Sequence, residues 1–182
     1  LRPQLGDELP FYANLGIAQV EDLLDKNQID KIEKMLSKLR ADGLIIHVNP
    51  LQEWFQPEGD KYKHSPIETI ERLLAVLNYP IIVKEVGQGF GPRSLEALIQ
   101  LPLAAIEFGA FGGTNFSKLE LLRNKAASHQ GLCHVGHTAE EMVHSINLLK
   151  EKLKGRVLCE NFIISGGVKD YLDGMSLVQK IH

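Results

Sequence analysis

Short apolar runs alternate along this chain with stretches that have the periodicity of amphipathic helices. Five of the apolar runs are short and bounded by proline, glycine or polar residues, a pattern that predicts strands, and the run at 44–48 is also partly β-branched. The predicted strands are Pro10–Gly16, Leu44–Val48, Ile81–Val86, Ala104–Gly109 and Asn161–Ser165.

The segments between the predicted strands carry clear helix-start signals. Ser65-Pro66-Ile67-Glu68 combines an N-cap serine, a proline at the first helical position and a glutamate that closes a capping box. Thr138-Ala139-Glu140-Glu141 repeats that box ahead of another predicted helix. Further helices are predicted at 30–39 and 94–100, and Asp170 is predicted to cap the last one.

Strand, loop and helix, repeated with short links, predict a parallel sheet with crossover helices. Two α/β architectures share this pattern, the doubly wound open sheet and the (β/α)8 TIM barrel. We favour the TIM barrel, because polar residues and glycines follow several predicted strands in succession, and in a barrel all of these loops open on one rim. An open sheet would concentrate its function at one switch point.

The chain is short for a complete barrel. A TIM barrel usually has about 250 residues and eight strands, whereas this chain has 182 residues. We therefore expect residues 1–182 to form a single, partial TIM-barrel domain of about five βα units, with about two strands missing before it and one after it.

Composition excludes several classes of function. The net charge is −3, with 20 basic and 23 acidic residues interspersed, which argues against nucleic acid as a partner. No apolar run is long enough to span a membrane, and the first residues lack the regions of a signal peptide. Cys133 and Cys159 lack metal-type spacing and are expected to be reduced thiols. These features predict a cytoplasmic protein without a membrane partner.

The most informative chemistry follows the second predicted strand. His47 and Asn49 should project from the same face, because residues two apart on a strand share a face. Gln52 and Glu53 follow in the predicted loop after Pro50. This cluster offers an imidazole, two amides and a carboxylate to one small polar ligand, with oxygen atoms suited to Mg²⁺. The alternative is a strand end followed by a polar turn.

Two glycine-rich loops also follow predicted strands. In Ser165-Gly166-Gly167-Val168-Lys169, the paired glycines would let backbone N–H groups approach a phosphate at a helix N-terminus. A tight structural turn is the alternative. The segment Gly109–Phe116 offers Thr114 and Asn115 as donors beside a backbone that a ligand can approach closely, and here the alternative is a flexible turn.

Lys84 lies near the end of an otherwise apolar predicted strand, where a lysine is costly unless an anion pairs with it. A ring with developing negative charge, such as the pyrimidine side of a flavin, would be a suitable partner. Pairing with Glu85 or another carboxylate is the alternative. Asn14 also ends a strand and is suited to bonding a ring edge or a substrate, and we interpret 61–64 as a solvated loop.

Taken together, these segments resemble the flavin-dependent, type 2 isopentenyl-diphosphate delta-isomerase family. The matching pieces occur in the family's order and cover nearly the whole chain. The histidine-to-glutamate segment and its Gln-Pro-Glu-Gly-Asp extension are highly specific, whereas the double glycines alone would not be. The matching pieces are Ala13–Gly16, His47–Glu53, Gln56–Asp60, Val83–Gly87, Gly112–Phe116 and Ser165–Gly167.

The resemblance implies a TIM barrel that binds FMN and Mg²⁺ and interconverts isopentenyl diphosphate and dimethylallyl diphosphate. It implies that the flavin must be reduced, normally by NADPH, although the reaction has no net redox change. The expected partner is therefore a small-molecule diphosphate substrate. A homo-oligomer is also implied, because the family is known for tetramers and octamers.

Family roles carry over to the positions that match. The residues implied to hold FMN or its phosphate are Asn14, Lys84, Thr114, Gly166, Gly167, Val168 and Lys169. The residues implied to hold the substrate are His47, Asn49 and Gln52, of which His47 and Gln52 are the predicted catalytic residues. Glu53 is the implied ligand of Mg²⁺.

The chain also departs from the family pattern. An N-terminal arginine–lysine pair, an early Met-Thr-Gly-Gly loop and a closing strand are absent, so we do not expect this stretch alone to catalyse the reaction. Two mild changes are Gly109, where many members have serine, and Lys169, where arginine is common. The alternatives are another FMN-dependent barrel of the 2-hydroxy-acid oxidase type and a catalytically inert barrel fragment.

Overall fold

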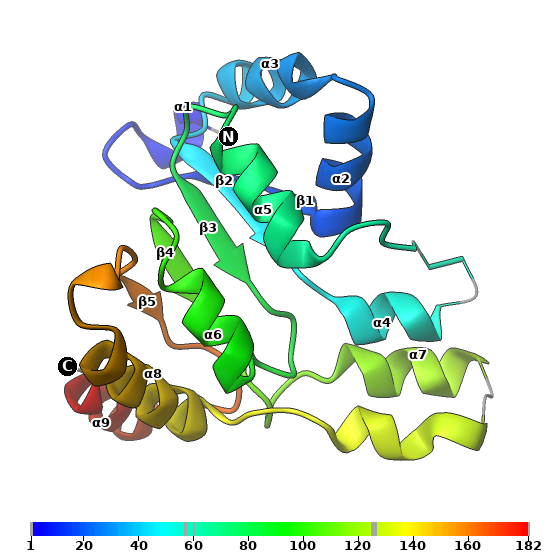
Figure 1. Cartoon of the computed structure of the whole chain (residues 1–182), viewed down its shortest axis with the longest axis vertical. Helices are drawn as coiled ribbons and strands as arrows, with labels where there is room; N and C mark the ends of the chain where they lie inside the picture. The colour runs from blue at the N-terminus through cyan, green and yellow to red at the C-terminus, as the bar shows by residue number, and fades with distance from the viewer. Residues whose placement is uncertain (1, 57, 60, 125–126, 182) are drawn as a thin grey trace.

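The computed structural model of the chain describes residues 2–56, 58–59, 61–124 and 127–181. Within them, parallel strands form one sheet in the order β1-β2-β3-β4-β5 (Figure 1). The strands are β1 (Tyr12–Gly16), β2 (Gly43–His47), β3 (Ile81–Lys84), β4 (Ala105–Glu107) and β5 (Phe162–Ile163). All five predicted strands are confirmed. β2 begins one residue earlier than predicted, and the other four are shorter.

Helices connect these strands. They are α1 (Arg2–Leu5), α2 (Ile17–Asp25), α3 (Ile29–Leu39), α4 (Pro50–Phe55), α5 (Pro66–Leu74), α6 (Pro92–Leu98), α7 (Phe116–Asn124), α8 (Ala139–Leu153) and α9 (Tyr171–Lys180), with 3-10 turns η1 (Ala127–His134) and η2 (Lys154–Arg156). At α5, Ser65 accepts the N–H of Glu68 as predicted, but Glu68 does not complete the predicted capping box. Thr138 forms the full predicted capping box at α8. Asp170 caps α9 as predicted.

The predicted TIM barrel is wrong, because the sheet is open. β1 pairs with β2 alone and β5 with β4 alone, so both are edge strands. Barrel closure requires the first and last strands to pair with a consistent stagger, and no such ladder occurs among the described residues. The cue for the barrel was not specific, since any parallel βα sheet collects its loops at the carboxyl edge. The strand order also lacks the reversal of a doubly wound sheet.

The two faces of the sheet have different surroundings. Residues on one face, such as Leu44, Ile46 and Val83, belong to the hydrophobic core with residues of α2, α3, α5, α6 and α8. Alternate residues point the other way. On that second face, Ile82 and Ala105 are buried but lie outside this core, and Ile163 is exposed. The candidate site lies on this second face.

The segment 61–64 is a loop in which Lys61 and Lys63 are exposed, as predicted, and its backbone is also held against α2. The buried carboxylate of Glu21 accepts the N–H groups of Lys63 (3.1 Å) and His64 (2.7 Å). Burial opposes ionisation of Glu21, but these backbone donors and the His64 imidazole outweigh it, and the pKa of Glu21 lies below its ordinary value. This contact fixes the chain between α4 and α5.

Asp25 gives this region a pH dependence. Hydrogen bonds from Lys63 (2.9 Å) and Arg72 (2.9 Å) lower the pKa of Asp25 from 3.8 to about 2. A lowered pKa stabilises the fold above pH 3.8, and that stabilisation disappears as the pH falls through about 2. We therefore expect Asp25→Asn to be less stable than the unaltered protein at pH 5, with the difference shrinking towards pH 2.

Urea unfolding at several pH values measures that difference. Substitution of both donors, Lys63→Met with Arg72→Met, should remove the same pH-dependent part. A stability difference between Asp25→Asn and the unaltered protein that stays constant down to pH 2 would contradict the assignment.

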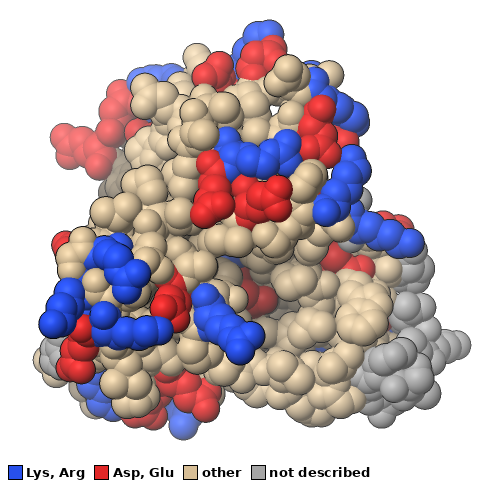
Figure 2. Space-filling model, in the orientation of Figure 1, with Lys and Arg blue, Asp and Glu red and all other residues tan. Residues whose placement is uncertain are grey.

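The structure also shows how charge is distributed, where the cysteines lie and how apolar the helices are. Lysine and arginine are intermixed with aspartate and glutamate on the face shown in Figure 2. Cys133 and Cys159 are both buried. Among the described residues, none of the helices combines the length and the apolar character that a membrane crossing needs.

Candidate functional site

A row of polar side chains crosses the carboxyl end of the sheet on its second face. The strand register pairs Gly16 with His47, His47 with Lys84, and Lys84 with Glu107. His47 Nδ1 lies 2.7 Å from Asn14 Oδ1, and Lys84 Nζ lies 3.8 Å from Glu107 Oε1. Four neighbouring strands thus contribute to a single polar layer, in which three side chains named from the sequence, Asn14, His47 and Lys84, lie together.

His47 is uncharged at neutral pH in this setting. Burial lowers the pKa of His47, the positive charge of Lys84 lowers it further, and the negative charge of Glu53 opposes both. Because the oxygen of Asn14 faces Nδ1, the imidazole donates from Nδ1 and keeps Nε2 as an acceptor. Gly16 leaves room for this ring, since a Cβ there would lie 3.1 Å from His47 Nε2. His47 Nε2 is therefore a neutral hydrogen-bond acceptor on the strand next to Lys84.

Glu107 is a member of this row that the sequence analysis missed. It lies 3.8 Å from Lys84 Nζ, and its Oε1 also accepts a 3.2 Å hydrogen bond from Ser165 Oγ. Lys84 Nζ itself donates to the carbonyl of Glu85 (2.9 Å). The signal was present, because Glu107 is a lone acid in an apolar strand. The partner carboxylate of Lys84 is therefore Glu107, across the sheet.

The cluster after β2 is built differently from the prediction. β2 ends at His47, and Asn49 is the N-cap residue of α4, so Gln52 and Glu53 lie on a helix. Pro50 at the first helical position favours this early start. The prediction of a loop for these two residues is wrong.

Asn49 organises the start of α4. It is buried, and its Nδ2 donates to Glu53 Oε1 (2.7 Å) and weakly to Gln52 Oε1 (3.4 Å). The Tyr62 hydroxyl lies 3.5 Å from Asn49 Oδ1. Since its amide is occupied within the chain, Asn49 is better placed to orient Gln52 and Glu53 than to contact a ligand.

The described residues contain no cluster of three or more histidine, cysteine, aspartate or glutamate side chains that could hold a metal ion. Glu53 is a carboxylate close enough to influence the pKa of His47. A Mg²⁺ ion there would take one protein carboxylate, and phosphate oxygens and water would complete its coordination. Mg²⁺ commonly binds in this way.

The residues predicted to hold a cofactor are distributed over two pockets. A pocket of ≈ 210 Å³ is lined by Lys84, Thr114 and Gly166, among others. A second pocket of ≈ 300 Å³ is lined by Gly166, Gly167 and Lys169. Because Gly166 belongs to both, the two pockets adjoin. Val168 lines neither, and Asn14 lies across the sheet beside His47.

The glycines of these loops serve loop packing. Gly166 has φ +86°, and a Cβ there would lie 2.2 Å from the carbonyl oxygen of Ala110. A Cβ on Gly167 would lie 2.8 Å from the carbonyl oxygen of Phe111. Close approach of the two loops therefore requires glycine whether or not a phosphate binds.

The N-terminus of α9 is poorly suited to binding a phosphate. Asp170 accepts the N–H of Asp173 (2.9 Å), and Asp173 accepts the N–H of Lys169 (3.0 Å). Two carboxylates at a helix N-terminus occupy its donors and repel an anion. A phosphate would meet the glycine backbone more favourably than this helix end.

The chain is similar to curated proteins named isopentenyl-diphosphate delta-isomerase. It is 36% identical over 170 residues to the protein of Legionella pneumophila strain Lens and 32% identical over 178 residues to that of Stutzerimonas stutzeri, which covers 92% and 96% of this chain. These matches cover 47% and 49% of the two relatives. The protein of Chlorobium chlorochromatii is 42% identical over 113 residues, 62% of this chain and 31% of that relative.

The relatives bear the name of an isomerase. That name does not distinguish type 1 from type 2. This chain spans about half of the length of the two longer matches. Comparison with models of protein families gives no match.

Proposed function

We propose that this chain contributes to an isopentenyl-diphosphate delta-isomerase of the flavin-dependent, type 2 kind, which interconverts isopentenyl diphosphate and dimethylallyl diphosphate with FMN and Mg²⁺. The isomerase part is supported by the names of the relatives. One observation carries the finer part: Lys84 belongs both to the polar row with His47 and Glu107 and to the pocket with Thr114 and Gly166. NADPH as reductant and a homo-oligomeric assembly belong to the same proposal.

The donor set suits one edge of a flavin. Lys84 offers a cation, and backbone groups at Gly87 and Gly109 line the same pocket. The pocket, at ≈ 210 Å³, is smaller than the roughly 300–1,000 Å³ of common ligand sites. Lys84, Thr114 and the glycine backbone of this pocket would therefore hold one polar edge of the flavin. FMN would supply, in its reduced form, the group that exchanges protons with the alkene.

The diphosphate end would lie towards α4. Glu53 would hold Mg²⁺, and the positive charge of Lys84 would favour the same anion. His47, neutral and fixed by Asn14, would accept a hydrogen bond at Nε2 without adding a charge. Gln52 would orient the substrate, because an amide has no useful pKa for proton transfer.

The reaction places a strong requirement on the protein. An unactivated alkene is a poor base, so its protonation needs an acid held close and water excluded. Apolar side chains next to the polar row, Ile45 and Ile82, would pack against the hydrocarbon part of the substrate. The polar row would position the charged end.

Two measurements on the purified protein test the proposal. Addition of FMN should shift the flavin absorbance bands on binding. Deuterium from the solvent should then enter isopentenyl diphosphate when this chain forms part of a complete isomerase, the FMN is reduced with dithionite and Mg²⁺ is present. Bound flavin without proton exchange would favour an oxidase of the 2-hydroxy-acid type, and no flavin binding would favour an inert fragment.

Lys84→Met provides the matched variant. We expect it to weaken FMN binding by at least about tenfold, because a charge-assisted hydrogen bond is lost. Lys34→Met on the exposed face of α3 is the control and should leave the FMN affinity unchanged. Equal FMN affinity in the two variants would contradict the role of Lys84.

A further inference from the structure

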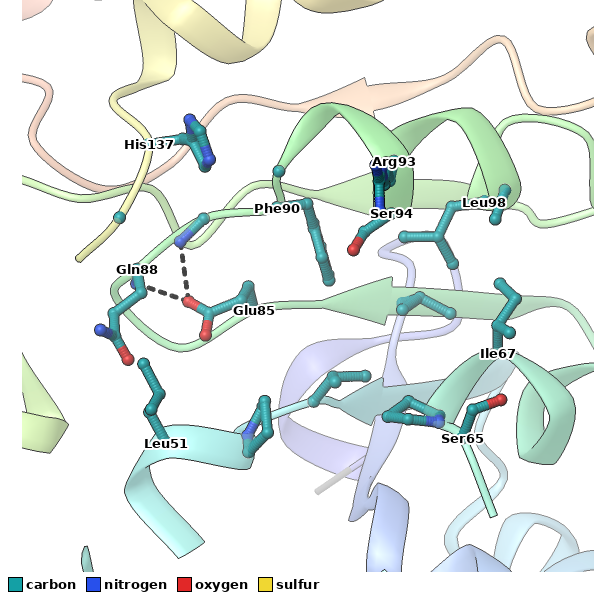
Figure 3. A pocket seen from close by; sticks show the side chains of 18 of the residues that line it. Leu51, Ser65, Ile67, Glu85, Gln88, Phe90, Arg93, Ser94, Leu98 and His137 are labelled. Carbon is teal, nitrogen blue, oxygen red and sulfur yellow. Dashed lines mark hydrogen bonds between the residues drawn. The ribbon is translucent and has the colours of Figure 1, made fainter. Parts of the chain in front are cut away.

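A cavity of ≈ 500 Å³ lies on the opposite side of β3 from the candidate site. Val83 lines it, whereas the next residue, Lys84, faces the polar row. Its wall is mostly apolar and comes from α4, α5, α6 and the loop after β3 (Figure 3). Side chains that form this wall include Val48, Leu51, Ile67, Phe90 and Leu98. Its volume falls in the roughly 300–1,000 Å³ range of small-molecule sites.

One carboxyl oxygen within this cavity has no partner. Glu85 is 5% exposed, and the hydrogen bonds to its carboxyl group all end on Oε2, which accepts the N–H groups of residues 86–89. No fully buried side-chain nitrogen or oxygen in the described part of the chain lacks a hydrogen-bond partner, so Oε1 keeps some accessible surface. Glu85 lines the cavity, which places this surface within reach of a ligand there. Figure 3 shows the Glu85 carboxyl group between Gln88 and Phe90, above Leu51.

Burial raises the pKa of Glu85, while the backbone donors oppose that effect. A ligand that donates a hydrogen bond to Oε1 would compensate the carboxylate for the water it has lost. Loop packing explains the four bonds to Oε2 but leaves Oε1 unexplained. Oε1 is therefore the acceptor to which a ligand in this cavity could donate a hydrogen bond.

The charges around the cavity narrow the class of ligand. Glu85 inside it repels an anion. Arg93 and His137 also line the cavity. The positive charge of Arg93, which is exposed at the edge, disfavours a cationic ligand. A neutral ligand that donates a hydrogen bond avoids both electrostatic penalties.

We propose that this cavity is a second binding site, for a neutral amphipathic alcohol whose hydroxyl donates to Glu85 Oε1 and whose hydrocarbon part contacts the wall. The site is separate from the polar row and does not depend on the proposed isomerase function. It shares a backbone with that row, because Lys84 Nζ donates to the carbonyl of Glu85.

Three probes with the same phenylbutyl chain test the chemistry of this site: 4-phenylbutanol, its methyl ether and 4-phenylbutylamine. Isothermal titration calorimetry or ligand-observed NMR gives their affinities. We expect the alcohol to bind at least about tenfold more tightly than the ether, because the ether cannot donate to the carboxylate. An ether that binds as tightly as the alcohol, or an amine that binds most tightly, would overturn the proposal.

Two variants locate the site. Glu85→Gln keeps an oxygen for the loop and turns an NH₂ group towards the cavity, so the alcohol should lose its advantage over the ether. Ser94→Phe on α6 should fill the cavity and abolish binding, whereas Ser37→Phe on the exposed face of α3 should not change it. Thermal unfolding of each variant shows that it is folded. Unchanged alcohol binding in folded Ser94→Phe would exclude this cavity.

Discussion

Glu85→Ala is expected to destabilise the protein by about 3 kcal/mol or more, because several N–H groups lose their acceptor at once and each buried unsatisfied donor costs about 1–3 kcal/mol. Oε2 of Glu85 accepts from Val86 (2.7 Å), Gly87 (2.7 Å) and Gly89 (2.9 Å), and also from Gln88. Two of these N–H groups, those of Gly87 and Gln88, are buried. Urea unfolding followed by circular dichroism measures the change.

The loop that Glu85 holds supports other parts of the site. The Gln88 carbonyl accepts the N–H of His137 (2.7 Å), and Gly89 N–H reaches the carbonyl of Gly109 (3.1 Å). Thr114 touches the same loop, since a Cβ on Gly87 would lie 2.2 Å from the Thr114 carbonyl oxygen. We therefore expect Glu85→Ala to loosen the Gly109–Phe116 loop as well. Hydrogen exchange would detect faster exchange there.

Two further variants make this test specific. Glu85→Gln retains an acceptor oxygen and should be destabilised less than Glu85→Ala. Glu151→Ala on the exposed face of α8 should change stability by no more than about 0.5 kcal/mol. A Glu85→Ala variant as stable as Glu151→Ala would show that the loop does not need its carboxylate.

Glu53→Gln is expected to weaken Mg²⁺-dependent binding of isopentenyl diphosphate by at least about tenfold, because Mg²⁺ would lose its one protein carboxylate. Glutamine has the shape of glutamate and can still accept the 2.7 Å hydrogen bond from Asn49, so α4 should keep its position. The affinity for FMN should stay the same, because Glu53 does not line the pocket that contains Lys84. This expectation rests on the proposed function.

Calorimetric titration with isopentenyl diphosphate, in Mg²⁺ and again in EDTA, measures the metal-dependent part of the substrate affinity. A separate titration with FMN measures the flavin affinity. Glu58→Gln is the matched control, since Glu58 lies on the same segment but is exposed and paired with Arg123 at 3.4 Å. A Glu53→Gln variant that loses FMN but keeps its affinity for the diphosphate would refute the assignment of Glu53 to the metal.

Much of the local structure could be predicted because its causes are local. Thr138 and Glu141 cap α8 through groups three residues apart, and Ser65 accepts the N–H of Glu68 at the start of α5 over the same spacing. The five strands follow from runs of apolar residues. The start of α4 at Pro50 was missed, because a polar segment after a proline also suits a turn.

Several site features could not be read from such patterns. Glu107 lies 23 positions after Lys84 in the chain, and only the register of β3 and β4 brings their side chains together. Glu21 on α2 contacts residues 63–64, which precede α5, because the two helices pack side by side. Asn49 was interpreted as a ligand group, although its amide is bonded to Glu53. Contacts of this kind depend on how elements pack.

The sequence by itself determined the alternation of strands and helices, the caps, and the polar residues at the carboxyl ends of strands, because periodicity and capping act over a few residues. Tertiary structure alone decided whether the sheet closes, and it showed an open sheet with β1 and β5 at its edges. It also decided that Asn14, His47, Lys84 and Glu107 form one row. Strand pairing is a long-range interaction, and the residues of one strand do not specify the position of the next.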